Sequence, residues 1–224
     1  MMTRFSKAVL FSAFALFLSS SVKAATVAWT NWTSSTANTA AGSLLTGGST
    51  VAVSYSGEIS FTQLNNSGTN YYTPAGTYVN GPTTSDLIAI TGSNTVHTIT
   101  FSSAVTNPEI AIVSLGGSTG PTSYTFNAPF TILSQGATTA FGGCGTCLTV
   151  SGNTVTGNEG NGIIQFTGSF TSLSFTGGAT AEFWNGFTVG DPIVATVVPE
   201  PASLGAAFAG LLALGAYARK RRQA

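Results

Sequence analysis

The sequence predicts an all-β fold, an antiparallel β-sandwich or jelly roll, between two targeting segments. Three observations lead to this prediction. Short runs that alternate apolar and polar residues recur between residues 50 and 189, as is typical of half-buried strands. No segment between Thr26 and Val197 keeps a helical period over three turns. Turn-forming residues rich in Gly and Asn separate the runs, at residues 65–68, 80–82, 116–117, 142–143 and 177–178.

The expected strands follow one another along the chain. In residues 50–55 every second side chain is apolar, and in residues 96–101 the alternating face holds His97, Ile99 and Phe101. The runs have no fixed repeat length, so a solenoid is not favoured. The remaining expected strands are residues 59–61, 87–90, 109–115, 123–126, 130–133, 148–150, 162–166, 173–175 and 183–189.

Residues 1–24 have the features of a signal peptide that directs export. Arg4 and Lys7 form a basic start, and an apolar stretch of residues 8–18 follows them. Small residues precede a cleavage point after Ala24, with Ala25 as an alternative. We therefore expect signal peptidase to remove this segment, and the alternative is an N-terminal anchor that is retained. Residues 25–197 would then form one secreted domain.

The C-terminal segment, residues 198–224, combines a short acidic turn, an apolar run and a basic end. The turn is formed by Val198, Pro199, Glu200 and Pro201. Residues 202–218 carry no charge, and as a helix they would reach roughly 25 Å, which is near the short limit for crossing a bilayer. The basic residues that follow favour a single transmembrane helix with a cytoplasmic end, over a buried helix of a soluble domain. They are Arg219, Lys220, Arg221 and Arg222.

These three parts, in this order, resemble the sorting signal of bacterial PEP-CTERM proteins, and the resemblance is confined to about residues 198–222. It implies a transient inner-membrane anchor that an exosortase-like sorting enzyme recognises and cleaves near Pro199–Pro201. It also implies a final location at the cell surface or outside the cell, in bacteria that make exopolysaccharide or biofilm. The resemblance implies nothing about the activity of residues 25–197.

The charges are distributed unevenly along the chain. All seven Lys and Arg lie in the two targeting segments, so a processed domain would carry a net charge of about −6 or −7. Without cations to neutralise phosphate, the domain is not expected to bind nucleic acid, anionic lipid or phosphorylated small molecules. Neutral glycans and cations that bridge the acids stay compatible. The acids are Glu58, Asp86, Glu109, Glu159, Glu182, Asp191 and Glu200.

The sequence contains no recognisable catalytic set. Residues 116–120 match the Gly-x-Ser-x-Gly pattern of hydrolases, but Pro121 and an expected strand follow instead of a helix. The single histidine, His97, precedes that serine and has no neighbouring metal ligands, so a buried strand histidine is the simpler interpretation. We expect no catalytic residue, metal site or cofactor.

Cys144 and Cys147 form a Cys-x-x-Cys motif between a Gly-rich loop and an expected strand. Outside the cytoplasm two such thiols are expected to pair. The expected strand in place of a helix favours a small structural disulfide over a thioredoxin-like redox centre.

Two acidic features leave alternatives open. Residues 157–162 are rich in Gly and oxygen-bearing side chains, which suits a tight turn or a calcium loop, although one carboxylate is a poor cage. Glycoside hydrolysis needs two carboxylates about 5 to 10 Å apart, which scattered positions cannot establish. Exposed acids that solvate the domain are the simpler expectation for Glu58, Glu109, Glu159 and Glu182.

Aromatic residues are the remaining candidates for ligand contact. Some could form a platform for sugar rings, with core packing as the alternative, and they are Trp29, Trp32, Tyr71, Tyr72, Phe183 and Trp184. The preferred glycan contact is the segment that mixes an acid, two aromatics and an amide, namely Glu182, Phe183, Trp184 and Asn185.

We therefore expect an exported surface or matrix protein without enzymatic activity, with neutral exopolysaccharide as its candidate ligand. One alternative is an extracellular glycan-cleaving enzyme, which two acids facing each other in a groove would favour. Another is an ice-binding or adhesion protein, which a flat and regularly spaced Thr face would favour.

Overall fold

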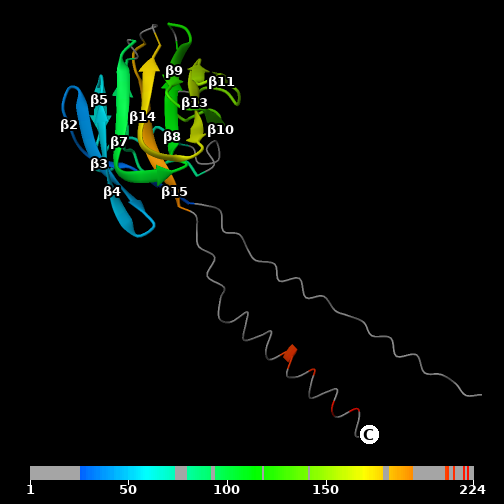
Figure 1. Ribbon diagram of the computed structural model, residues 1–224. Coiled ribbons are helices and arrows are strands. Elements are labelled where there is room, and N and C mark those ends of the chain that lie inside the picture. The colour runs from blue at the N-terminus through cyan, green and yellow to red at the C-terminus, as the bar shows by residue number, and fades with distance from the viewer. Residues whose placement is uncertain are drawn as a thin grey trace, which may run out of the picture. The chain divides into compact units, whose positions relative to one another are not determined.

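The computed structural model describes residues 26–73, 80–91, 94–117, 119–140, 142–178 and 182–193, together with single positions near the C-terminus (Figure 1). Residues 25–195 separate from both ends of the chain as one compact unit. The expected signal peptide and Val198–Pro201 lie outside the described residues. Of the expected helix 202–218, only Gly210, Leu211 and Leu214 are described, and these are helical, as are Arg219 and Arg221. Among all described residues, no helix combines the length and the apolar character that crossing a membrane requires.

Two antiparallel sheets pack as a sandwich, which confirms the fold class predicted from the alternating pattern. In the seven-stranded sheet, β1 (Thr26–Trp29) pairs with β15, and the other strands follow the order β10 (Phe130–Gln135), β13 (Gly160–Phe166), β8 (Glu109–Leu115), β15 (Asn185–Ile193), β6 (Leu87–Ile90) and β5 (Phe61–Gln63). The eight-stranded sheet has the order β11 (Leu148–Ser151), β12 (Thr154–Gly157), β9 (Thr122–Phe126), β14 (Ser169–Gly177), β7 (Val96–Thr106), β4 (Ser49–Ser56), β3 (Thr39–Thr46) and β2 (Asn31–Ser35).

The main core lies between the two sheets. Val51, Val53 and Tyr55 of β4 point into it, as their alternation predicted. Phe126 contacts Phe166 across the sandwich with ring centroids 5.0 Å apart. Each fully buried aliphatic or aromatic side chain of this kind contributes about 1.5–3 kcal/mol. The alternating strands therefore supply one apolar face each to a shared interior.

The seven-stranded sheet is buried on its outer face as well. All residues of β6 and β8 are buried, so the apolar run of each strand serves two layers. A second apolar cluster covers the outer face, with small side chains at Ala89 and Ala111 beneath Tyr72 from the segment between β5 and β6. Strands buried on both sides are expected to be apolar along their length. The larger side chains partly buried around this cluster are Trp29, Phe61, Tyr71 and Trp184.

Trp32 connects the sheets where the chain passes from β1 into β2. Its indole Nε1 donates a hydrogen bond to Thr188 Oγ1 at 3.1 Å, and its backbone N donates to Asp86 Oδ1 at 3.1 Å. The side chain is fully buried, so for Trp32 the structure matches core packing and not an exposed platform.

Candidate functional site

Three segments that the sequence marked separately meet at one place in the domain. They are the Gly116–Gly117 turn after β8, the Asn158–Glu159 turn between β12 and β13, and residues 182–185 leading into β15. They meet because β8 pairs with both β13 and β15, which aligns these segments at the same end of neighbouring strands. We take this cluster as the candidate functional site.

Glu182 is held by two donors. Its Oε1 accepts hydrogen bonds from the backbone N of Gly116 at 3.0 Å and from Asn185 Nδ2 at 2.5 Å. Burial raises the pKa of Glu182 to about 7; the two hydrogen bonds oppose this shift and the charge of Glu159 adds to it. The carboxyl group therefore titrates near neutral pH.

Glu159 lies on the other side of the same turn. Its backbone N donates to Gly116 O at 3.0 Å, and its Oε2 accepts a hydrogen bond from Ser114 Oγ at 3.0 Å. A Cβ atom at Gly117 would lie 2.8 Å from Glu159 Oε1 and 3.5 Å from Glu182 Oε2. The two carboxyl groups thus lie near one glycine, and a side chain at that position would require the Glu159 carboxyl group to shift while only touching that of Glu182.

Two buried amides brace this arrangement. Asn161 Oδ1 accepts from Ser114 N at 2.8 Å, while its Nδ2 donates to Glu159 O at 3.0 Å and Gly142 O at 3.3 Å. Asn185 Oδ1 accepts a hydrogen bond from the Tyr124 hydroxyl. Ser114 has a φ of +57°, unusual for a strand residue, where its hydroxyl bonds to Glu159. Sequence reasoning missed Ser114; a polar residue inside the apolar run 109–115 was its only signal.

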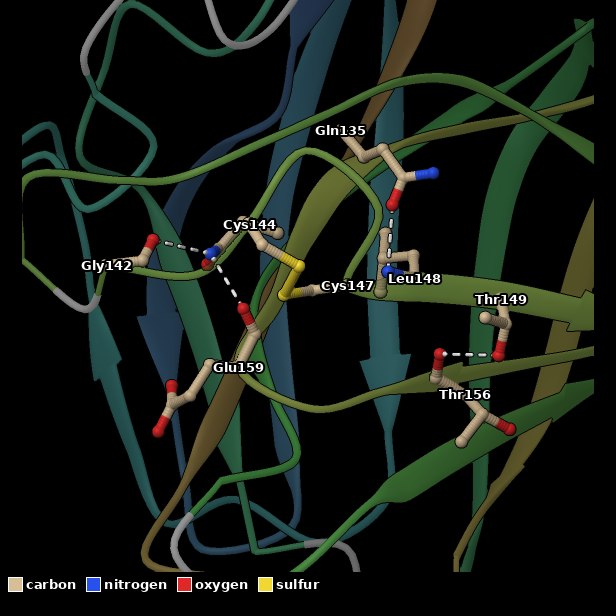
Figure 2. The surroundings of a disulfide bond; sticks show 9 residues. Gln135, Gly142, Cys144, Cys147, Leu148, Thr149, Thr156 and Glu159 are labelled. Atoms are coloured by element: carbon tan, nitrogen blue, oxygen red, sulfur yellow. Dashed lines mark hydrogen bonds between the residues drawn. A yellow bond between two sulfur atoms is a disulfide. The ribbon is translucent and has the colours of Figure 1, made fainter.

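The disulfide loop lies against the same turn (Figure 2). Cys144 and Cys147 are bonded, which agrees with the predicted pair, and β11 begins directly afterwards at Leu148. Cys147 O accepts from Asn158 N at 3.2 Å, and Gln135 Oε1 accepts from Leu148 N at 2.8 Å. The strand that follows, in place of a helix, fits a structural crosslink that holds the loop beside Glu159.

The four predicted glycan-contact residues have different surroundings. Phe183 is 91% exposed, whereas Asn185 is fully buried and Glu182 is partly buried. Trp184 packs against Phe61 and Tyr71, with ring centroids 4.9 and 5.3 Å apart. The expected strand 183–189 begins only at Asn185, opposite Ile90 at the end of β6, so Phe183 precedes the paired strand.

The other sequence candidates lie elsewhere or have structural roles. Gly117 and Gly120 exchange backbone hydrogen bonds of 3.1 and 2.9 Å, and β9 follows, so the Gly-x-Ser-x-Gly match is a turn; Ser118 itself is outside the described residues.

His97 is fully buried, with Nδ1 2.6 Å from the Tyr55 hydroxyl and Nε2 3.1 Å from Thr95 Oγ1. Burial lowers the pKa of His97 to about 4 against the opposing effect of Glu58.

The expectation that four glutamates are exposed and merely solvate the domain is wrong. Glu109 is only 3% exposed, and Glu58, Glu159 and Glu182 are partly buried. Burial raises the pKa of Glu109 to about 7; a hydrogen bond from Gln165 opposes the shift, and the charge of Asp191 adds to it. Glu109 lies in β8, and the other three precede β5, β13 and β15 of the same seven-stranded sheet. Within the described ranges, no group of three or more His, Cys, Asp or Glu is placed to hold a metal ion.

Comparison with known proteins identifies the C-terminal segment alone. Residues 197–222 match the PEP-CTERM protein-sorting motif, which confirms the resemblance drawn from the Pro-Glu-Pro turn, the apolar run and the basic end. The motif implies an exported protein that an exosortase processes and sorts to the cell surface. Neither a curated protein nor a solved structure matched the chain.

Proposed function

We propose that the β-sandwich of this exported, exosortase-sorted protein is a non-enzymatic module that binds neutral polysaccharide at the cell surface. The single observation that carries the proposal is the exposure of Phe183, which is 91% exposed and directly follows the partly buried Glu182 in the chain. An aromatic ring of this size is normally buried in a soluble domain. Its exposure, at the position after a glutamate that hydrogen bonds hold in place, supports a role in ligand contact.

The chemistry of the site favours a sugar. The flat face of Phe183 can pack on the C–H face of a sugar ring, and carboxyl oxygens accept hydrogen bonds from sugar hydroxyls. Glu182 is already positioned by Gly116 N and Asn185 Nδ2, so little ordering would be needed on binding. Residues 25–218 contain no Lys or Arg, which disfavours an acidic polysaccharide.

Affinity electrophoresis of the full-length chain in detergent tests this proposal. The gels would contain dextran, galactomannan or xyloglucan as neutral polymers, and alginate as an acidic one. Phe183→Ala should weaken binding to a neutral polymer at least fivefold. Leu45→Ala, at an exposed residue in β3, is the matched control and should leave binding unchanged. Unchanged binding by Phe183→Ala, or a preference for alginate, would contradict the proposal.

A glycan-cleaving enzyme is the second candidate, because two carboxyl groups flank Gly117 and the pKa of Glu182 is raised to about 7. A raised pKa on one of two paired acids is the property of a general acid. Against this, Oε1 of Glu182 already accepts two internal hydrogen bonds, and Oε2 of Glu159 accepts one. Release of reducing ends from these polymers, abolished by both Glu182→Gln and Glu159→Gln, would establish the enzyme and overturn the binding module.

A further inference from the structure

The outer face of the eight-stranded sheet is rich in hydroxyl side chains. None of its eight strands contains an Asp, Glu, Lys or Arg. Hydroxyl residues face each other across neighbouring strands, with Ser54 opposite Thr100 and Ser56 opposite Thr98. The pattern continues into β14, where Ser172 lies opposite Thr100 and Ser174 opposite Thr98. The face is therefore uncharged and dominated by hydroxyl groups.

This face is hollowed at the corner formed by β2, β3 and β4. The hollow has a volume of about 340 Å³. Ala41, an exposed residue with a small side chain, lies in register between Ser34 and Ser54 and leaves space there. Most residues that line the hollow carry hydroxyl groups, among them Ser34, Thr36, Thr39, Ser54 and Ser56.

The walls of the hollow are held in place. Thr36 Oγ1 and Thr39 Oγ1 are 2.8 Å apart, and Thr36 N donates to Thr39 O at 2.7 Å, which closes the turn between β2 and β3. Ser35 Oγ lies 2.8 Å from Thr62 Oγ1 of β5, so the edge strand is fastened to the other sheet. A register shift between Trp32 and Ser34 sets β2 off from β3 at this point. Fixed walls lower the ordering cost of binding.

We propose that this hollow is a second binding site, separate from the cluster at Glu182, which takes one or two sugar units of a neutral polysaccharide. Its volume lies at the low end of the range for small-molecule sites. Hydroxyl groups both donate and accept hydrogen bonds, so they can match sugar hydroxyls in either sense. With no charged residue in the lining, an anionic or cationic ligand would lose its hydration without compensation. The assignment rests on the proposed neutral-glycan function for its ligand class, but not on Phe183.

A second site on the same domain would make binding to a polymer bivalent. A long chain held at one site is presented to the other at high effective concentration. The full-length protein is therefore expected to bind a long neutral polymer more tightly than a short oligosaccharide of the same sugar. Loss of either site should weaken polymer binding while leaving binding at the other.

The test fills the hollow without touching the core. Ala41→Phe places a ring where sugar is expected, and Ala52→Phe is the matched control, because Ala52 is an exposed alanine of the same sheet face that does not line the hollow. Affinity electrophoresis of the full-length chain in detergent, on the same neutral polymers and alginate, should show at least fivefold weaker binding for Ala41→Phe and unchanged binding for Ala52→Phe. Thermal unfolding by circular dichroism checks that both variants are folded.

The outcomes separate this inference from the proposed function. Weaker binding by Phe183→Ala with normal binding by Ala41→Phe overturns the second site and leaves the first. Weaker binding by Ala41→Phe with normal binding by Phe183→Ala supports the hollow and overturns the contact at Phe183. If Ala52→Phe weakens binding as much as Ala41→Phe, the whole face binds and the hollow is not a distinct site. If none of the neutral polymers is retained by the unaltered chain, both proposals fail.

Discussion

The outer faces of the two sheets differ in burial and in composition. The seven-stranded sheet is covered by a second apolar cluster, and Glu109 and Asp191 of its strands are removed from water. The eight-stranded sheet turns Ser and Thr toward solvent and has no acidic or basic residue in its strands. The outer face of one sheet therefore adds to the buried interior, while that of the other is a neutral surface. The second apolar cluster therefore forms a third layer in addition to the two sheets.

The largest effect is expected when the same charge is placed on each outer face, which tests whether the two faces differ in burial. Ala111→Asp would bury a carboxylate under the second apolar cluster, and Ala52→Asp would place one in water. We expect the first to lower the free energy of unfolding by more than about 3 kcal/mol, and the second by less than about 0.5 kcal/mol. Urea unfolding of the full-length chains, followed by tryptophan fluorescence, measures both. Similar losses for the two variants would show that the outer faces are equally exposed.

The second expected difference between the sheets is in how their buried titratable residues make the unfolding free energy depend on pH. The pKa of Glu109 is raised to about 7, so the folded state binds a proton that the unfolded state releases near pH 4.5. Its contribution is fully present below about pH 4.5 and is lost as the pH rises through about 7. Glu109→Gln should therefore flatten the decline of unfolding free energy between about pH 5 and 8. A decline as steep in Glu109→Gln as in the unaltered chain would contradict this role for Glu109.

His97, a fully buried residue of β7 in the eight-stranded sheet, acts in the opposite direction. Its pKa is lowered to about 4 from 6.5, so the unfolded state takes up a proton first as the pH falls. Its contribution is lost as the pH falls from about 6.5 through about 4, which limits stability in acid. This range overlaps the one in which the Glu109 contribution is lost. The unfolding free energies of the Glu109→Gln and unaltered chains are therefore compared over the same pH series, because both chains contain His97.

The smallest expected effect is that of the disulfide, which closes the loop before β11 next to the turn at Glu159. Cys144 and Cys147 are three positions apart, so the bond closes a very short loop. Replacing both with Ser should cost about 2 kcal/mol or less. Urea unfolding of this variant, beside the unaltered chain with and without reductant, measures the loss. A loss above about 4 kcal/mol would mean that the loop organises more of the domain than its length suggests.

The sequence predicted the sandwich because period-two alternation survives in strands such as β4 and β7. It missed β1, β2, β3 and β12, where Ser, Thr, Ala and Gly give little contrast between faces, as in the TAAGSLLT of β3 and the TVTG of β12. It also underestimated burial. Residues 87–90 were expected only as a strand, and the structure shows that Tyr72, from the segment between β5 and β6, belongs to the cluster that covers the outer face.

The candidate site was predicted in pieces. Residues 116–120, 157–162 and 182–185 each stood out for their own composition, and none of them indicated the others. Their meeting depends on β8 pairing with β13 on one side and β15 on the other. Ser114, with its positive φ, acquires its role only after that pairing exists.

The sequence by itself determined the destination of this protein and its fold class. A sorting motif is a contiguous segment whose turn, apolar length and basic end are visible in linear order, and a strand's alternation is equally local. Only the tertiary structure decided that Glu159 and Glu182 flank Gly117, and that Ala41 leaves a hollow among hydroxyl groups. The physical reason is that side chains far apart in sequence become neighbours through the register of strand pairing. A shift of one residue in that register would turn each of them to the opposite face.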